Sequence, residues 1–72
     1  MKDIRERNED TAGYRISELR KDRGWNQKEL AEKTGIRQSN ISRIENGSAS
    51  PTIDTLARIA AGLGKQLKID FV

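Results

Sequence analysis

The sequence predicts a small, mainly α-helical fold, in which a bundle of four short helices is followed by one C-terminal β-strand. Three observations lead to this prediction. The chain has 72 residues, which is enough for one small domain. Apolar residues recur at three- and four-residue spacing in four segments, each of which ends at a glycine or an Asn-Gly pair. From residue 65 onward the spacing changes to alternation, which is typical of a strand.

The composition limits how the fold can be stabilised. Leucine, isoleucine, valine and phenylalanine make up fifteen of the 72 residues, the lower edge for a globular domain. A core of this size is marginal and often depends on a disulfide, a metal or a second subunit. Cysteine and histidine are both absent, which excludes disulfides, zinc fingers and catalytic triads. We therefore expect no metal, no cofactor and no catalytic residues, and a second subunit as the stabilising partner.

Charge and hydropathy indicate the kind of partner. No apolar run approaches the roughly 18 residues that span a membrane, and the charged start does not resemble a signal peptide. Residues 1–11 hold three bases, four acids and only two apolar residues, which predicts a mobile arm. Residues 12–72 hold eleven bases and seven acids. This excess of bases permits an acidic partner such as nucleic acid. Without an apolar span or a signal peptide, we expect a cytoplasmic protein that has no membrane partner.

The first two helices are predicted from their stop and start signals. The first runs from about Ala12 to Arg23 and stops at Gly24, while Gly13 weakens its first turn. Asn26 opens the second helix, because Asn26 and Glu29 form the pattern of a capping box.

The third and fourth helices follow at once. The third runs from Arg37 or Gln38 to Glu45 and is closed by the turn signal Asn46-Gly47. Thr52 caps the fourth, which covers Ile53 to Leu63 before Gly64 breaks it. Residues 12–64 are therefore expected to form one domain.

A face suited to DNA is predicted on the third helix. The turn at Gly35 joins it to the second helix, and such a pair presents the second member to a major groove. At about 100° per residue, Ile41 and Ile44 point inward. The outward face has no acid, whereas an ordinary solvated face usually mixes Glu and Lys. It carries groups that hydrogen-bond base edges, namely Ser39, Ser42, Arg43 and Asn46, flanked by Gln38 and Asn40.

These residues resemble the helix-turn-helix of the Cro and phage-repressor (XRE) family. The resemblance covers about residues 12–64 and implies a four- to five-helix bundle that binds operator DNA as a dimer. It also implies a protein encoded by a bacterium or a phage. The residues that carry it are Gln27, Leu30-Ala31, Gly35-Ile36, Ile41-Ser42, Glu45-Asn46-Gly47 and Ser50-Pro51-Thr52.

The resemblance also assigns roles position by position. Gln27 and Asn46 match phosphate contacts, the latter together with the Gly47-Ser48 backbone. Arg20 and Glu45 match an ion pair that ties the first helix to the end of the third. The base-reading positions correspond to Gln38, Ser39 and Arg43.

Arg37 departs from the family pattern, which often has a capping Ser or Thr at this position. Arg37 cannot cap a helix through an acceptor oxygen. Either the cap is lost, or Arg37 serves a contact with phosphate or bases, and we favour the contact. The full set of expected DNA-binding residues is Gln27, Arg37, Gln38, Ser39, Asn40, Ser42, Arg43, Asn46 and Ser48.

Residues 65–72 are predicted to form a dimerisation strand. Leu67, Ile69 and Phe71 alternate with polar residues, and no other segment of the chain can pair with them. The simplest partner is the same strand of a second copy, antiparallel across a two-fold axis. A tail that only caps its own core or is disordered is the alternative.

The sequence thus predicts a repressor that binds a palindromic double-stranded operator as a homodimer. The ending of the chain also resembles antitoxins of the HigA and HipB type, which implies a toxin protein as a further partner. The alternative function is a helical module that binds a toxin or another protein without specific DNA binding. The acid-free face of the third helix argues against that alternative, and an enzyme ranks third because the chain has no His and no Cys.

Overall fold

The structure, a computed structural model, describes residues 12–71. Four helices are present in this part of the chain: α1 (Ala12–Asp22), α2 (Gln27–Thr34), α3 (Gln38–Glu45) and α4 (Ile53–Gly62). These bounds agree with the predicted ones to within one or two residues, so the helical bundle is confirmed. The arm predicted for residues 1–11 lies outside the described residues.

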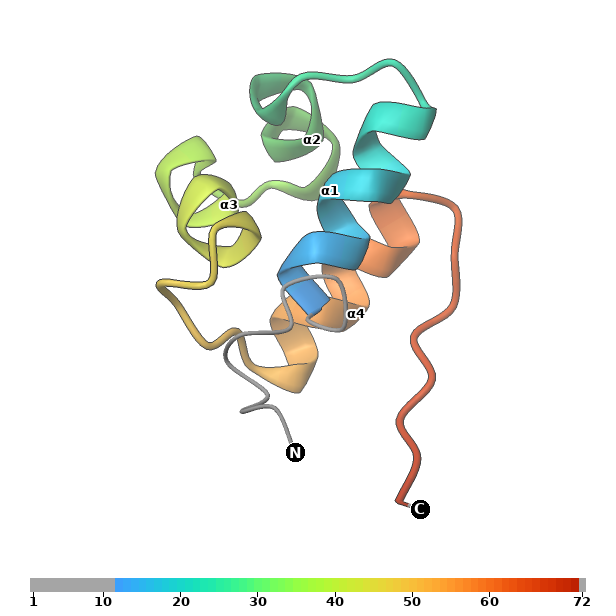
Figure 1. The fold of residues 1–72 in the computed structure, drawn as a ribbon. Helices are drawn as coiled ribbons and strands as arrows, with labels where there is room; N and C mark the ends of the chain where they lie inside the picture. The colour runs from blue at the N-terminus through green and yellow to red at the C-terminus, as the bar shows by residue number, and fades with distance from the viewer. Residues whose placement is uncertain (1–11, 72) are drawn as a thin grey trace.

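The helices pack so that α3 is held from two sides. In Figure 1, α2 and α3 lie beside the longer pair formed by α1 and α4. Helix α3 packs against both α1 and α2, and α2 also packs against α4. All four helices contribute to one core, whose buried apolar residues are Ile16, Leu30, Ile36, Ile41, Ile44, Ile59 and Leu63.

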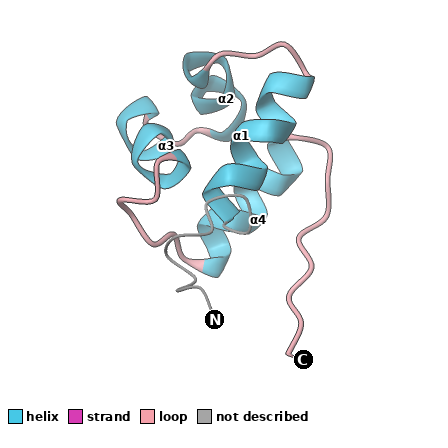
Figure 2. Cartoon of the chain, viewed as in Figure 1, coloured by secondary structure: helices cyan, strands magenta, loops and turns pink. Residues whose placement is uncertain are grey.

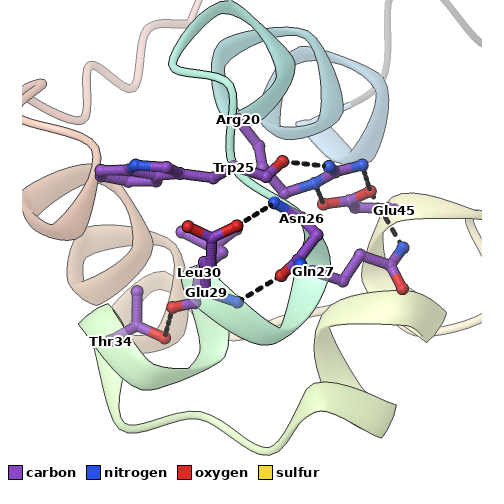
Figure 3. A network of polar contacts seen from close by, with 8 residues as sticks. All are labelled: Arg20, Trp25, Asn26, Gln27, Glu29, Leu30, Thr34 and Glu45. Atoms are coloured by element: carbon purple, nitrogen blue, oxygen red, sulfur yellow. Dashed lines mark hydrogen bonds and ion pairs between the residues drawn. The ribbon is translucent and has the colours of Figure 1, made fainter.

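The turn between α2 and α3 has the chemistry that the sequence indicates. Asn26 Oδ1 accepts from the Glu29 N–H at 2.8 Å, and Glu29 Oε1 accepts from the Asn26 N–H at 3.0 Å. This capping box starts α2 (Figure 3). At the other end, Gly35 has φ +71° and donates its N–H to the Ala31 carbonyl. A left-handed residue at this position ends α2 and turns the chain into α3.

Gly13 is a packing residue. A Cβ atom on Gly13 would overlap the carbonyl oxygen of Ile44 and lie 3.2 Å from that of Glu45. The absence of a side chain therefore lets the first turn of α1 lie directly on the backbone at the end of α3. The sequence analysis interpreted this glycine only as a weakness of the first turn, because a crossing of two helices leaves no local signal.

Residues 65–71 form no strand within the described chain (Figure 2). The Lys65 N–H donates to the Ala60 carbonyl at 2.8 Å, and residues 66–71 make no backbone hydrogen bond with another described residue. The predicted strand is thus not formed in the single chain, and its pairing with a second copy stays a prediction. The physical reason is that a strand needs a neighbouring backbone, and no described segment provides one.

Among residues 12–71, no helix combines the length and the apolar character that crossing a membrane requires.

Candidate nucleic-acid interface

Helix α3 separates its apolar and polar side chains by face. Ile41 is fully buried and Ile44 is 5% exposed, so both anchor the helix in the core. Ser42 is half-buried and not fully outward as predicted; it lies in the second half of α3, close to where Gly13 of α1 meets the backbone of Ile44 and Glu45. The exposed residues are Gln38, Ser39, Asn40, Arg43 and Asn46.

The exposed residues of the first turn of α3 have side chains without a hydrogen-bond partner among the described residues. The side chains of Gln38, Ser39 and Asn40 make no hydrogen bond with another described residue. The described part of α3 has no acid in its first turn. This end of the helix therefore offers hydroxyl and amide groups that are ready to bond an external partner.

Arg37 begins α3 without capping it. Its backbone is extended, with φ −60° and ψ +140°, and its side chain makes no capping hydrogen bond. Its carbonyl accepts from the N–H groups of Asn40 at 3.0 Å and Ile41 at 3.1 Å. The guanidinium is exposed, as the departure from the family pattern suggested.

The far end of α3 is fixed by a buried ion pair (Figure 3). Arg20 of α1 donates from Nε to Glu45 Oε2 at 2.7 Å and from Nη2 to Glu45 Oε1 at 2.9 Å. Both side chains are at most 10% exposed. The hydrogen bond with Glu45 raises the pKa of Arg20, so the guanidinium stays charged despite its burial. Arg20 Nη1 also donates to the Trp25 carbonyl at 2.7 Å, which ties α1 to the start of α2.

Gln27 joins the same network. Its Nε2 donates to Glu45 Oε1 at 3.1 Å, so the first residue of α2 bonds the last residue of α3 (Figure 3). The sequence predicts a phosphate contact for Gln27 and gives no sign of this bond. No local pattern could have found it, since the two residues are eighteen positions apart. The bond places Gln27 beside the end of α3, half-buried.

The turn after α3 is also internally bonded. Asn46 Oδ1 accepts from the Ser48 N–H at 2.9 Å and from the Ser48 hydroxyl at 2.6 Å. The amide nitrogen of Asn46 bonds no described residue and remains a donor at the surface. Both residues are exposed.

A polar cleft of about 420 Å³ lies between α3, the following loop and α4. Arg37 and Asn40 line it from the α3 side, and Arg58 lines it from α4. None of its lining residues is acidic. Arg58 was not singled out from the sequence, because it sits in a helix whose pattern indicated only core packing.

Two short helices joined by a left-handed glycine, with the second one presenting an acid-free polar face, define a helix-turn-helix domain. The comparison with known proteins agrees. The family model described as helix-turn-helix matches residues 16–69, and the chain belongs to this XRE-type helix-turn-helix family, whose members bind DNA as transcription regulators.

Similar proteins are regulators rather than enzymes. The chain is 44% identical over 48 residues to the HTH-type transcriptional regulator SutR of Escherichia coli, which covers 67% of this chain and 27% of SutR. It is 39% identical over 57 residues to the immunity repressor protein of Bacillus phage phi105, covering 79% of this chain and 40% of the repressor.

A solved structure shares the fold. The restriction-modification controller protein C.Esp1396I superposes with a TM-score of 0.74 and 33% identity, covering 76% of this chain and 70% of that one. The chain spans less than half the length of SutR and of the phage repressor.

Proposed function

We propose that this chain is a repressor that binds a palindromic double-stranded operator as a homodimer and reads base pairs with α3. The observation that carries the proposal is the exposed, acid-free polar face of α3, held outward by Ile41 and Ile44. The likeness to a phage immunity repressor and to a controller protein supports the repressor role. In a two-fold dimer, the half-sites are expected about one helical turn, roughly 34 Å, apart.

The roles divide between reading and docking. Arg43 is the strongest base reader, because a guanidinium binds the two acceptors of guanine at once. Ser42 is half-buried and reads only at close approach. The remaining readers are Gln38, Ser39 and Asn40, whereas the docking set, which positions the domain on phosphates, comprises Gln27, Arg37, Asn46 and Ser48.

The tail supplies the contact with the second copy of the homodimer. Leu67, Ile69 and Phe71 are exposed in the single chain, and pairing with the tail of a partner would cover them and satisfy the backbone. The antitoxin role and its toxin partner stay predictions from the resemblance of this tail.

The test begins with selection of an operator from random duplex DNA. Arg43→Ala should then lower affinity for that operator by about 1–3 kcal/mol and relax specificity at one base pair. Lys21→Ala is the control, because it removes one positive charge from an exposed residue of α1 that lies outside both α3 and the groove beside the tail. Equal losses of operator affinity in the two variants would show that Arg43 contributes only its positive charge and does not read a base. Failure to select any operator would favour the protein-binding module.

Gln27 separates docking from reading. Gln27→Ala should weaken binding to the operator and to a scrambled duplex by similar factors, because a phosphate contact carries no base information. The two dissociation constants are measured at one salt concentration. A loss confined to the operator would show that the bond from Gln27 to Glu45 sets the position of the reading helix.

A further inference from the structure

The tail carries an apolar stripe that the described chain leaves open. Leu67 is 37% exposed, Ile69 53% and Phe71 97%. Residues 65–68 of the tail line an apolar groove of about 280 Å³ between α1 and α4. In Figure 1 the tail turns at the end of α4 and runs to the C-terminus as a loop. The tail thus has three exposed apolar side chains that alternate along the sequence, and its first residues lie beside a groove.

We propose that two copies pair their tails antiparallel in one particular register, with the two-fold axis at Ile69. Ile69 then lies opposite Ile69 of the second copy, Lys68 opposite Asp70, and Phe71 opposite Leu67. This inference rests on the homodimer of the proposed function and specifies how its two chains meet.

Charge complementarity selects this register over its neighbours. An axis at Lys68 would place two lysines opposite each other, and an axis at Asp70 would place two aspartates opposite each other. Like charges directly opposite destabilise an antiparallel pair. An axis at Leu67 leaves both Lys68 and Asp70 without an opposite charge. Only the axis at Ile69 pairs Lys68 with Asp70, and symmetry makes that pair twice.

Side-chain alternation excludes the registers in between. An axis that falls between two residues would place Lys68 opposite Ile69 or Ile69 opposite Asp70. A slip of one residue moves every apolar side chain to the other face of the ladder. Only an axis that passes through a residue keeps the apolar side chains of both tails on one face of the ladder. Among these registers, the pairing of Lys68 with Asp70 favours the axis at Ile69.

The groove is consistent with the same register. Leu67 lines the groove together with Ile16 and Leu19 of α1 and Leu56 of α4. With Phe71 of the second copy opposite Leu67, its phenyl ring lies at the mouth of this groove. Phe71, the most exposed apolar side chain of the described tail, is then covered by helices α1 and α4 of the other copy. By symmetry, the groove of each copy receives one Phe71 side chain.

Cysteine scanning tests the register directly, because the chain contains no cysteine of its own. Ile69→Cys, Lys68→Cys and Asp70→Cys are each oxidised mildly, and the rate of disulfide dimer formation is compared. A residue on the axis meets its own copy at about the Cβ separation that a disulfide accepts. We expect Ile69→Cys to cross-link fastest and the other two at least roughly tenfold more slowly.

A charge swap provides the second measurement. Lys68→Glu should weaken dimerisation by roughly tenfold at low salt, because it places two acids opposite each other twice, and Asp70→Lys should do the same with two bases. The double variant should restore the dimer, as measured by sedimentation. Lys21→Glu is the control, since it makes the same charge change at an exposed residue of α1 that belongs neither to the tail nor to the groove.

The outcomes separate the register from the homodimer. A sedimenting dimer that cross-links fastest at 68 or 70, or that Lys68→Glu strengthens, overturns the register and leaves the proposed function intact. A dimer that cross-links at none of the three positions has its two-fold axis elsewhere, either at another residue of the tail such as Leu67 or outside the tail, and also overturns the register. A chain that stays monomeric both in solution and on its selected operator overturns the homodimer, and the register with it.

Discussion

The two ends of α3 are built in opposite ways. At its end, Glu45 accepts from Arg20 and Gln27, and Gly13 brings α1 onto the backbone. At its start, Arg37 makes no side-chain cap and the following polar residues are exposed. The difference shows how a short helix can be held rigidly at one end and present unpaired polar side chains for binding at the other. The end that is packed fixes its position, so the polar groups at the start need no internal partners.

The largest effect is expected from breaking the anchored end. Glu45→Ala would leave the buried Arg20 guanidinium without its carboxylate, which should lower the free energy of unfolding by about 3–5 kcal/mol. Urea unfolding followed by circular dichroism measures this loss. Because a domain of this size is marginal, Glu45→Gln is made in parallel, since it retains one acceptor and should lose less.

The control for Glu45 is an ion pair of the same chemistry at the surface. Arg15 Nη1 lies 2.7 Å from Glu18 Oε1, but the two side chains are 60% and 41% exposed. Glu18→Ala should therefore cost less than about 1 kcal/mol. Similar losses at Glu18 and Glu45 would mean that burial does not strengthen the pair, and the contrast between the two ends of α3 would fail.

The second effect concerns the crossing of α1 over α3. Gly13→Ala should lower the free energy of unfolding by about 1–3 kcal/mol, because the new methyl group meets a backbone carbonyl that cannot move away. Gly62→Ala is the comparison variant. Its Cβ would lie 2.7 Å from Thr34 Cγ2, a side-chain atom rather than a backbone carbonyl and a less severe overlap, so a smaller loss is expected in the same unfolding measurement. A stabilised Gly13→Ala variant would show that helix propensity outweighs the contact.

Local signals predicted the elements of this fold and left out its long-range contacts. The capping box at Asn26, the glycine that ends α2 and the cap at Thr52 are each encoded within four residues, and each lies where the sequence indicates. Gly13 against Ile44 and Gln27 against Glu45 join segments that only the folded chain brings together. The strand predicted for the tail is absent from the described single chain for a related reason, since its hydrogen-bonding partner does not lie within that chain.

The smallest effect tests the open start of α3. Arg37→Ser should raise the free energy of unfolding by about 0.5–1 kcal/mol, because the backbone of Arg37 already has cap geometry and a serine oxygen can accept from the N–H of Ser39 or Asn40. The same variant should bind the selected operator more weakly, since the exposed guanidinium is gone. Arg37→Ala separates the two effects: it should lose the same affinity without the gain in stability. If Arg37→Ser gained stability and kept full affinity, Arg37 would have no part in binding DNA, and the uncapped start of α3 would be without a function.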